Sequence, residues 1–579
     1  MNYVLLPELD TKQREKLKKY SDVLAHLLFH RGFKNIKTAE DFLDIDYKKD
    51  LLSPLVLKDM DKAVQRLRKA FSGKEKICIY SDYDADGIPG AVVLSDFFRK
   101  INFQNFFVYI PHRNREGFGV NNEAVDEIVS KGTRIIITID CGITDVKPIA
   151  RAVNAGIDVI VTDHHEPNGH KTKAIATINP KQEDCPVSDE NICGTGVIFK
   201  VVQALLLNFK TNSDDMNKKL KLNISDGWEK WLLDLVGIAT ISDMVPLIGE
   251  NRVFAKYGLL VLRKSPRKGL QYLLQDARVK QNLLNETDVA FTIAPRINAA
   301  SRMGEPMAAY KMLFTKDDAE AKESVKYLNK INNERKGKVA AIVRKVNKGL
   351  KGVEPPAVIV KGDPNWTPSL MGLVASKIVE TYNRPVFLWG RGEGKSLKGS
   401  CRSDGSISVV DIMNGVGDKI ITTFGGHKMA GGFVVSDEGV FDLEKELNNS
   451  YVKVIGDIKQ KKAVEMVIDK KLLIDDVTWD TFNEVEKLSP FGIGNESPKF
   501  LFEKVTIENI QFFGKGQEHL KLLFKKKDGK IILAIKFFAR GQENLEKLEA
   551  GQTINLVGSL EKSTFGYKTD LRVRIIEVL

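Results

Sequence analysis

The chain has 579 residues, of which 43% are hydrophobic and 28% are charged, an ordinary composition for a globular protein. This composition excludes a mostly disordered, collagenous or coiled-coil protein, and the length allows about four domains of roughly 150 residues each. The chain holds 88 Lys and Arg against 76 Asp and Glu, and the resulting net charge of +12 favours a polyanionic partner.

Residues 1–50 are predicted to form a helical extension. His26 and His30 lie four residues apart on one of its helices, a spacing that some metal sites use. Because no third ligand stands nearby in the sequence, we interpret both histidines as structural.

From residue 77 to about residue 180, short apolar runs alternate with helix-length segments, a pattern typical of parallel strands joined by crossovers. Three strands are predicted, at residues 77–81, 134–139 and 157–162, with helices at 90–100, 122–130 and 146–154. The strands are apolar on both faces, as expected when helices cover both sides of a sheet. We therefore predict a parallel-sheet α/β domain at residues 51–310.

One further helix is predicted within this domain, and a long helix and a second domain follow it. Residues 228–243 are predicted to form a largely apolar helix within it, and residues 316–351 form a long charged helix with little core to bury. This long helix, in the segment 311–352, is either a rigid connector between domains or an ordinary solvated surface helix. A smaller α/β domain is predicted at 353–455.

Residues 456–579 are predicted to form a small β-barrel, because β-rich runs alternate with Gly, Lys and Asp turns. From residue 499 onward, 15 Lys and Arg stand against 10 Asp and Glu, with nine Phe and Tyr. Basic strands interleaved with aromatics fit an OB-fold that binds single-stranded nucleic acid. The alternative is that the aromatics form the barrel core, which we prefer for Phe500, Phe502 and Phe537. We interpret residues 525–527, three lysines, as a solvated turn.

Acidic residues and histidines follow the ends of the three predicted strands. They are Asp82, Asp84 and Asp86 after the first strand, Asp140 after the second, and Asp163, His164 and His165 after the third. Because the carboxyl ends of parallel strands share one crevice, we expect these side chains to converge. A helix N-cap would explain one of the first three aspartates but not all of them.

Oxygen ligands with one or two imidazoles and no thiolate favour Mg²⁺ or Mn²⁺. These ligands exceed the needs of one ion, so we predict a pair of divalent ions about 3.5–4 Å apart, bridged by a carboxylate such as Asp140. Such pairs hydrolyse phosphate esters. Asp243, at the end of the apolar helix, is added as a ligand. The sequence leaves open which histidine binds metal and which polarises the phosphate.

Arg113 follows a predicted strand that ends near Ile110, and so lies at the same sheet edge as the acids. A guanidinium there can hold a phosphate through two hydrogen bonds, although an ordinary surface arginine is an equal alternative. The glycine pairs at 425–426 and 431–432 would let backbone N–H groups approach a phosphate, with His427 as a further donor; the alternative is a simple turn.

The five cysteines are widely spaced and form no C-x-x-C pair, so we expect reduced, structural thiols. No stretch approaches the roughly 18 consecutive apolar residues of a membrane span, and the first residues lack the pattern of a secretion signal. We expect a cytoplasmic monomer without membrane contact.

Nine short stretches carry a family resemblance. DYDADG, TIDCG, the DHH triplet and SDMVPL resemble the four motifs of the DHH phosphoesterase superfamily. Within it, APRINAASRMG, NWTPSLMGLVASKI, GSCRS, FGGHKMAGGF and SPFGIGNESP, in this order, resemble the RecJ family of single-stranded-DNA-specific exonucleases. The resemblance implies a DHH domain and a smaller DHHA1 domain joined by a long helix, followed by an OB-fold barrel.

The resemblance also implies an activity and a set of site residues. It implies a 5′→3′ exonuclease that degrades single-stranded DNA to 5′-mononucleotides in DNA repair and recombination, using two Mn²⁺ or Mg²⁺ ions. The implied metal and catalytic residues are Asp82, Asp84, Asp86, Asp140, His164, His165 and Asp243, with Asp163 orienting the histidines. The implied 5′-phosphate pocket contains Arg113, Arg296 or Arg302, Ser400 and Arg402, with Gly426 and His427 contacting the strand. A RecQ-type helicase and a single-strand-binding protein are expected partners.

Two positions depart from the family pattern. Thr367 stands where the family usually has the His of Trp-His-Pro, and Ser301 stands where it usually has Gly. Two other functions are weighed: a DHH phosphodiesterase acting on short oligonucleotides or cyclic dinucleotides, which should lack the basic barrel, and a non-catalytic DNA-binding DHH scaffold, which should have lost metal ligands.

Overall fold

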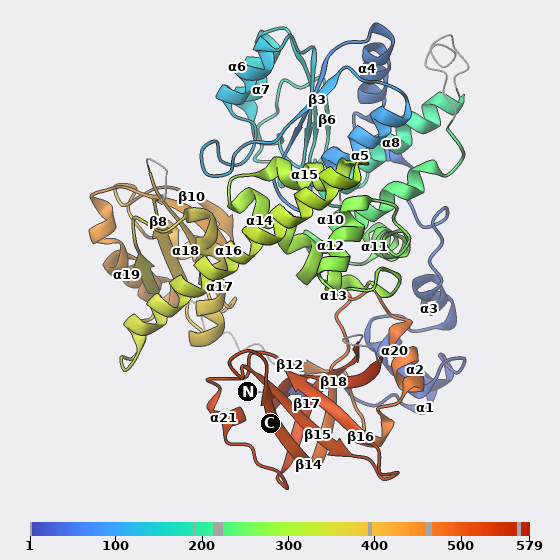
Figure 1. The fold of residues 1–579 in the computed structure, drawn as a ribbon, viewed down its shortest axis with the longest axis vertical. Helices are drawn as coiled ribbons and strands as arrows, with labels where there is room; N and C mark the ends of the chain where they lie inside the picture. Colours follow the sequence, from blue (N-terminus) through green and yellow to red (C-terminus); the bar gives the residue numbers. More distant parts are fainter. Residues whose placement is uncertain (1–2, 189–190, 212–223, 392–395, 458–465, 564–568) are drawn as a thin grey trace. The chain divides into compact units, whose positions relative to one another are not determined.

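A computed structural model describes residues 3–188, 191–211, 224–391, 396–457, 466–563 and 569–579. The chain forms two compact units (Figure 1). The smaller unit comprises residues 1–51, 246–256 and 462–579, and the larger unit comprises residues 52–245 and 257–461.

The first sheet of the larger unit is parallel throughout, with the strand order β3-β2-β4-β5-β6. Its strands are β2 (Ile77–Ser81), β3 (Phe106–Tyr109), β4 (Ile135–Ile139), β5 (Asp158–Thr162) and β6 (Ala176–Ile178). Ser81 lies opposite Ile139, and Ile139 lies opposite Thr162, so three strands end in register. The residues that follow them, Asp82, Asp140 and Asp163, therefore leave the sheet at one edge.

Helices cover both faces of this sheet, which explains why every residue of β2 and β4 is buried (Figure 1). Helices α6 (Asn122–Ser130) and α7 (Val146–Asn154) pack on the face that carries Tyr80 and Ile136. The other face is covered by α4 (Met60–Gly73), α5 (Gly87–Lys100) and α8 (Gly194–Thr211). The predicted strands and helices are confirmed, except that α5 begins three residues early, at Gly87.

A group of helices continues the domain, beginning with the 3₁₀ turn η2 (Trp228–Leu232) and the buried α10 (Leu233–Ser242), where one helix was predicted. Residues 249–256 of α11 (Gly249–Leu262) are assigned to the smaller unit and its remaining residues to the larger one. The following elements of the domain are α12 (Lys268–Asp276), α13 (Glu286–Asp288), the π-helical η4 (Val289–Ile293), α14 (Ala294–Arg302) and α15 (Pro306–Phe314). Helix α10 ends at Ser242, so Asp243 is its C-cap.

The long helix α16 (Asp318–Leu350) buries more than the sequence analysis predicted. Its first half packs on α12, α14 and α15, and its second half packs on α17 (Pro368–Tyr382). Within each half of the helix the buried apolar positions recur every three or four residues, and many charged residues on the other faces mask this stripe in the composition. The prediction of little core was therefore wrong, and the interpretation as a rigid connector is confirmed.

The second sheet is mixed, with the strand order β10-β11-β9-β8-β7. Its strands are β7 (Ile359–Gly362), β8 (Val386–Gly390), β9 (Leu397–Arg402), β10 (Ile421–His427) and β11 (Ala430–Val435). Only β7 and β8 pair in parallel. Helix α17 packs on one face, and α18 (Val409–Asn414) and α19 (Leu443–Asp457) complete the domain on the other. The predicted smaller α/β domain is confirmed.

The C-terminal strands close into a barrel in the order β13-β14-β15-β16-β18-β17, because β14 also pairs with β17. The strands are β13 (Lys470–Lys471), β14 (Phe500–Phe513), β15 (His519–Lys525), β16 (Ile531–Lys536), β17 (Thr553–Ser563) and β18 (Asp570–Val578). Two short helices, α20 (Trp479–Glu486) and α21 (Glu543–Glu546), accompany it. The predicted OB-like barrel is confirmed.

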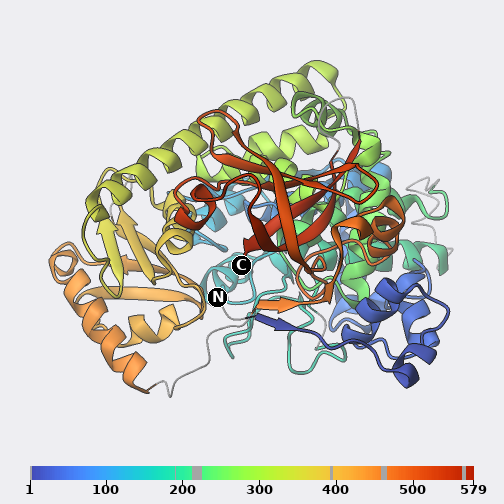
Figure 2. The same cartoon turned by 90° about the horizontal axis from the view of Figure 1, so that it is seen from below.

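The N-terminal elements belong to the same unit as the barrel. Strand β1 (Tyr3–Leu5) pairs in parallel with β12 (Met466–Ile468), as Figure 2 shows. Helices α2 (Asp22–His30) and α3 (Ile36–Leu43), and Leu17 just after α1 (Thr11–Glu15), share one hydrophobic core with the barrel strands. His26 is buried, and its Nε2 lies 2.7 Å from the carbonyl oxygen of Asp469. The structural interpretation of His26 agrees with this contact.

All five cysteines are buried and free, as predicted for reduced structural thiols. Within the described ranges, no helix combines the length and the apolar character needed to cross a membrane.

Candidate metal centre and adjoining pocket

The turn after β2 shows why three aspartates occur together. The Asp84 Oδ1 accepts the backbone N–H groups of Asp86 (2.7 Å) and Gly87 (3.1 Å), so Asp84 caps α5. Gly87 cannot be replaced easily, because a Cβ there would lie 2.5 Å from the Asp82 carbonyl oxygen. One of the three carboxylates is therefore partly used in the turn, and Asp82 and Asp86 point elsewhere.

Asp86 is held by the N-terminus of α8. Its two carboxylate oxygens accept the backbone N–H groups of Gly194 (2.6 Å) and Thr195 (2.7 Å), where the helix dipole favours negative charge. Gly194 also allows a close approach, because a Cβ at this position would lie 2.6 Å from the Asp140 Cβ. Gly194 and Thr195 were not predicted as site residues, and the only signal in the sequence was a Gly-Thr-Gly segment before an apolar run.

Two further side chains fix the same turn. The Asn298 Oδ1 accepts the Ala85 N–H at 2.9 Å, and the Ser242 hydroxyl donates to the Ala85 carbonyl oxygen at 3.0 Å. Asn298 comes from α14 and Ser242 from the end of α10. Both lie inside stretches that carried the family resemblance, but their roles could not be read from those stretches.

His164 points into the middle of the acidic side chains. Its Nε2 lies 3.1 Å from Asp140 Oδ1, 3.6 Å from Asp86 Oδ2 and 3.7 Å from Asp243 Oδ2. Three overlapping groups bring potential ligand atoms within 4.8 Å of one another: Asp140 with His164 and His165, Asp86 with His164 and Asp243, and Asp82 with Asp84 and Asp140. All seven predicted ligands therefore meet at one place.

Asp163 forms hydrogen bonds with both histidines. Its carboxylate accepts the N–H groups of Ile143 (2.9 Å), His164 (2.7 Å) and His165 (3.1 Å), and its Oδ1 lies 2.8 Å from His165 Nδ1. Burial alone would raise the pKa of Asp163. The hydrogen bonds and the charge of His165 outweigh burial and keep this pKa below its usual value. With its oxygens saturated, Asp163 can orient the His165 ring but has little capacity left to bind an ion.

The centre fits divalent cations. Among the described residues, Asp82 Oδ1 and Asp140 Oδ1 are buried without a hydrogen-bond donor. Burial and neighbouring carboxylates raise the pKa values of Asp82 and Asp140 well above the usual value, and raise the pKa of Asp243 to about 9. Crowded, donor-free carboxylate oxygens are what Mg²⁺ or Mn²⁺ would stabilise.

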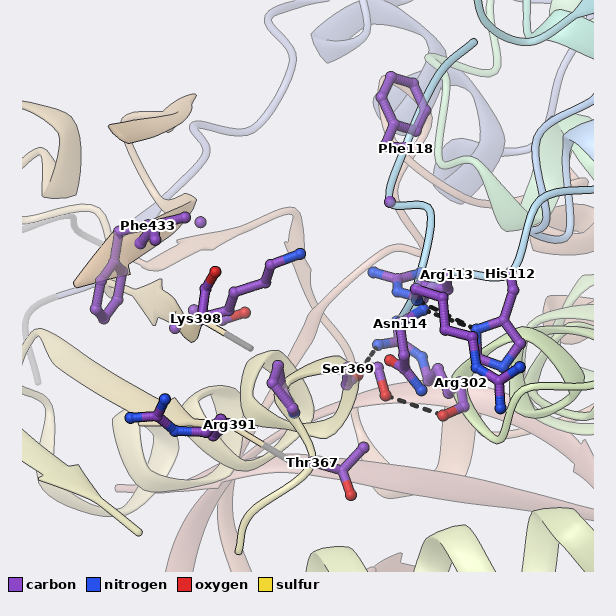
Figure 3. A pocket seen from close by; sticks show the side chains of 18 of the residues that line it. His112, Arg113, Asn114, Phe118, Arg302, Thr367, Ser369, Arg391, Lys398 and Phe433 are labelled. Carbon is purple, nitrogen blue, oxygen red and sulfur yellow. Dashed lines mark hydrogen bonds between the residues drawn. The ribbon is translucent and has the colours of Figure 1, made fainter. Parts of the chain in front are cut away.

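A pocket of about 1100 Å³ lies in the larger unit between the loop after β3 and the second sheet. Figure 3 shows Arg113, Arg302 and Ser369 on one side of it, with Lys398 and Phe433 on the other. Ser400, Gly425 and Gly432 also line it. Thr367, the departure from the family pattern, forms part of the wall.

Four arginines in or near this pocket lack acidic partners, whereas Arg391, which also lines it, pairs with Asp437. In the described part of the chain, no carboxylate forms an ion pair with Arg113, Arg302, Arg335 or Arg402. Burial and the other three arginines lower the pKa of Arg302 to about 9. Arg302 also donates to the Ser369 carbonyl oxygen (2.5 Å), and the Ser369 hydroxyl donates back to the Arg302 carbonyl oxygen (2.9 Å). Uncompensated, partly buried guanidinium groups favour binding of an anion.

Several predicted phosphate contacts lie elsewhere. Arg296 does not line the pocket, because its guanidinium donates to Asn329 Oδ1 and to the Thr292 carbonyl oxygen, both at 2.7 Å. Gly426 and His427 lie in exposed β10 and are not among the lining residues. Arg402 does not line the pocket either, and its Nη1 donates to the Cys401 carbonyl oxygen at 2.7 Å. Arg335 was missed, since nothing distinguishes it among the charges of α16.

The barrel carries an aromatic and arginine face, defined by Phe512, Phe513, His519, Phe537, Phe538, Arg540 and Arg574. The His519 ring lies 5.0–5.2 Å from the rings of Phe513, Phe537 and Phe538. Arg540 lies 4.0 Å over Phe512, and Arg574 lies 4.5 Å over Phe537. Phe500 and Phe502 are core residues as predicted, but Phe537 is only half-buried, so its assignment to the core was wrong.

Three family models match the chain: the N-terminal domain of the DHH family at residues 76–236, the DHHA1 domain at 355–454 and the RecJ OB domain at 468–577. The single-stranded-DNA-specific exonuclease RecJ of Bacillus subtilis is 33% identical over 535 residues, which are 90% of this chain and 65% of that protein. This chain thus spans 65% of the length of that relative.

Three solved structures of RecJ proteins are also similar to this chain. The crystal structure of RecJ with Mn²⁺ from Thermus thermophilus is 28% identical with a TM-score of 0.80, over 100% of this chain and 79% of that chain. Its Mg²⁺ complex has a TM-score of 0.74 at 26% identity, over 100% and 78% of the two chains. A crystal structure of exonuclease RecJ bound to manganese is 31% identical with a TM-score of 0.59, over 71% of this chain and 99% of that chain.

Proposed function

The chain belongs to the RecJ family of single-stranded-DNA-specific exonucleases, and on this premise we propose that it is a divalent-metal-dependent 5′→3′ exonuclease. It would release 5′-mononucleotides from single-stranded DNA in repair and recombination. The observation that carries this proposal is the presence, in one unit, of the seven converging ligands and of the arginine pocket, which is lined by Arg113 and Arg302, neither of which forms an ion pair in the described part of the chain.

The seven ligands would hold two Mn²⁺ or Mg²⁺ ions, and Asp140 and His164 each belong to two of the three ligand groups. The ions would activate a water molecule and offset charge on the leaving oxygen. His164 Nε2, which faces three carboxylates, is the better placed ligand. His165, oriented by Asp163 and more exposed, would face the substrate phosphate.

The arginine pocket would supply the direction of degradation. A terminal 5′-phosphate carries close to two negative charges where an internal phosphate carries one, so the arginines should favour that end. Arg113 and Arg302 line the pocket and would contact the phosphate directly, together with Ser400. The single strands would be supplied by a RecQ-type helicase and a single-strand-binding protein, which we propose as partners.

The metal centre makes stability depend on pH when ions are absent. A carboxyl group with a raised pKa in the folded protein stabilises it at low pH, and this contribution is lost as pH rises from the unfolded value near 4 to the folded value. For Asp243, whose pKa is raised to about 9 in the folded protein, this contribution is lost by about pH 9. We therefore expect the melting temperature in EDTA to fall between pH 6 and pH 8.5, and the increase on adding Mn²⁺ to grow over the same range.

This dependence can be checked by thermal melting of wild type and Asp243→Asn in EDTA and in Mn²⁺. The variant should be more stable than wild type in EDTA at pH 8.5 and should gain less from Mn²⁺. An equal gain from Mn²⁺ in both proteins at every pH would argue against Asp243 as a ligand.

The aromatic and arginine face of the barrel would bind the strand beyond the catalytic unit. Phe538 is 69% exposed in this face, as expected for a ring that stacks on a base. Phe538→Ala should weaken binding of a long oligonucleotide by roughly five- to a hundredfold, the equivalent of about 1–3 kcal/mol per stacked base. Fluorescence anisotropy with long and very short oligothymidylates measures this effect.

Phe441→Ala is the matched control, because Phe441 is 87% exposed and lies in the second α/β domain. Phe441→Ala should leave the affinities for long and for very short oligothymidylates unchanged. If Phe538→Ala weakened binding of very short strands as much as that of long ones, the proposed role of the barrel face would be wrong.

A further inference from the structure

The loop between β3 and α6 brings two side chains to the pocket. The Arg113 guanidinium lies 4.9 Å over the Tyr83 ring, one residue from Asp82. Phe118, which is 53% exposed, lies edge-on to His165 with ring centroids 5.3 Å apart. Both line the pocket, and Figure 3 shows them on the same loop. The shape of this loop therefore decides where a cation and an aromatic ring meet the substrate.

Glu116, in the middle of the loop, ties its two ends together. The Oε1 atom accepts the Tyr109 hydroxyl at 2.7 Å, where β3 ends, and the Asn121 side-chain amide at 3.4 Å, where α6 begins. The Oε2 atom accepts the His112 backbone N–H at 2.6 Å. Both carboxylate oxygens are thus occupied, and the backbone next to Arg113 is fixed by one of them.

His112 holds the next residues of the loop through hydrogen bonds with their backbone N–H groups. Its carbonyl oxygen accepts the backbone N–H groups of Arg115 (3.1 Å) and Glu116 (2.8 Å). Its Nδ1 accepts the backbone N–H groups of Asn114 (3.2 Å) and Arg115 (3.3 Å). The backbone is therefore held on both sides of Arg113, while the Arg113 guanidinium itself forms no ion pair in the described part of the chain.

A carboxylate three residues from Arg113 is unexpected beside a site that binds a polyanion, because it repels the ligand. We propose that Glu116 is a positioning residue that fixes Arg113 for the terminal 5′-phosphate, acting through the loop rather than by touching the substrate. This inference rests on the proposed function of the pocket. The proposal explains why a carboxylate stands at position 116: two acceptor oxygens are needed at once, one for the Tyr109 hydroxyl and one for the His112 N–H.

Glu116→Gln tests the inference, because an amide has one acceptor oxygen and a donor in place of the second. The Tyr109 hydroxyl or the His112 N–H must then lose its acceptor. We expect the ratio of affinities for 5′-phosphoryl and 5′-hydroxyl oligonucleotides, measured by anisotropy in EDTA, to fall about tenfold. Glu123→Gln, an exposed position on α6, is the control and should leave the ratio unchanged.

A double-mutant cycle separates positioning from a general structural effect. In an Arg113→Ala background, Glu116→Gln should not change the ratio further. Tyr109→Phe, which removes one hydroxyl and keeps the ring stacked on Tyr80, should lower the ratio in the same direction by a smaller factor. An unchanged ratio in Glu116→Gln, or the same fall with and without Arg113, would overturn the inference. A wild-type ratio of one would instead overturn the proposed function of the pocket.

Discussion

Asp140→Asn should lower exonuclease turnover by about a thousandfold or more while leaving the affinity for single-stranded DNA nearly unchanged. Metal charge stabilises a phosphoryl transition state by several kcal/mol, and each 1.36 kcal/mol is a factor of about ten. Asp140 belongs to two of the three ligand groups, and its Oδ1 lies 3.1 Å from His164 Nε2. The proposed DNA contacts lie in the arginine pocket and on the barrel, which the substitution leaves intact.

Asparagine is the appropriate replacement, because Asp140 has a φ of +61° and Asn tolerates the left-handed region well. The assay is single-turnover hydrolysis of a labelled strand in Mn²⁺, with binding measured in EDTA. Asp126→Asn, a surface carboxylate paired with Arg151, is the control. Turnover within tenfold of wild type in Asp140→Asn would rule out its predicted place between two ions.

Arg402→Ala should reduce discrimination between 5′-phosphoryl and 5′-hydroxyl strands by roughly tenfold, about 1.4 kcal/mol, because Arg402 does not line the pocket and acts through its positive charge beside Arg113 and Arg302. The guanidinium is close enough to lower the pKa of Arg302, and its own pKa is lowered by burial and then by Arg113. Its hydrogen bond is to the carbonyl oxygen of the neighbouring Cys401, so the variant should fold.

The measurement is the ratio of kcat/KM values for the two kinds of strand, with Arg344→Ala on the exposed side of α16 as control. The dependence on Mn²⁺ concentration should not change in Arg402→Ala. If the variant slowed both substrates by the same factor, Arg402 would have no role in recognising the 5′ end.

The sequence predicted the parts of the fold that follow from local patterns. The three strands at 77–81, 134–139 and 157–162 are apolar on both faces and are bounded by turns, so their position was clear. The core stripe of α16 was missed because charged residues dominate its composition. The assignment of Phe537 failed because β16 ends at Lys536, so Phe537 lies in the turn after the strand, where Arg574 covers its ring.

The same distinction between local patterns and tertiary packing holds for the metal centre and the pocket. The meeting of most of the seven proposed ligands could be predicted, because strands that end in register bring the residues after them to one edge, whereas Asp243 comes from the end of helix α10. Arg302 and Arg296 could not be told apart, since both lie on α14 and only packing shows which one lines the pocket. The residues that position others, such as Gly194 and Asn298, act through contacts between distant segments, which no local pattern reveals.

The N-terminal helices change how the barrel must be tested. Leu24, Leu27 and Leu28 share a core with Phe500 and Phe524, so a truncation near Ser489 would expose apolar surface on the helices that remain. Point substitutions on the barrel face, rather than truncation, therefore isolate its contribution to DNA binding.

The most direct test of the central claim is a product time course on strands labelled at the 5′ or the 3′ end, with and without Mn²⁺. We expect the 5′ label to appear at once as a mononucleotide, while the 3′-labelled strand shortens gradually, and we expect both reactions to stop in EDTA. Release of the 3′ label first, internal cleavage products, or equal rates in EDTA would contradict the proposed metal-dependent 5′→3′ exonuclease.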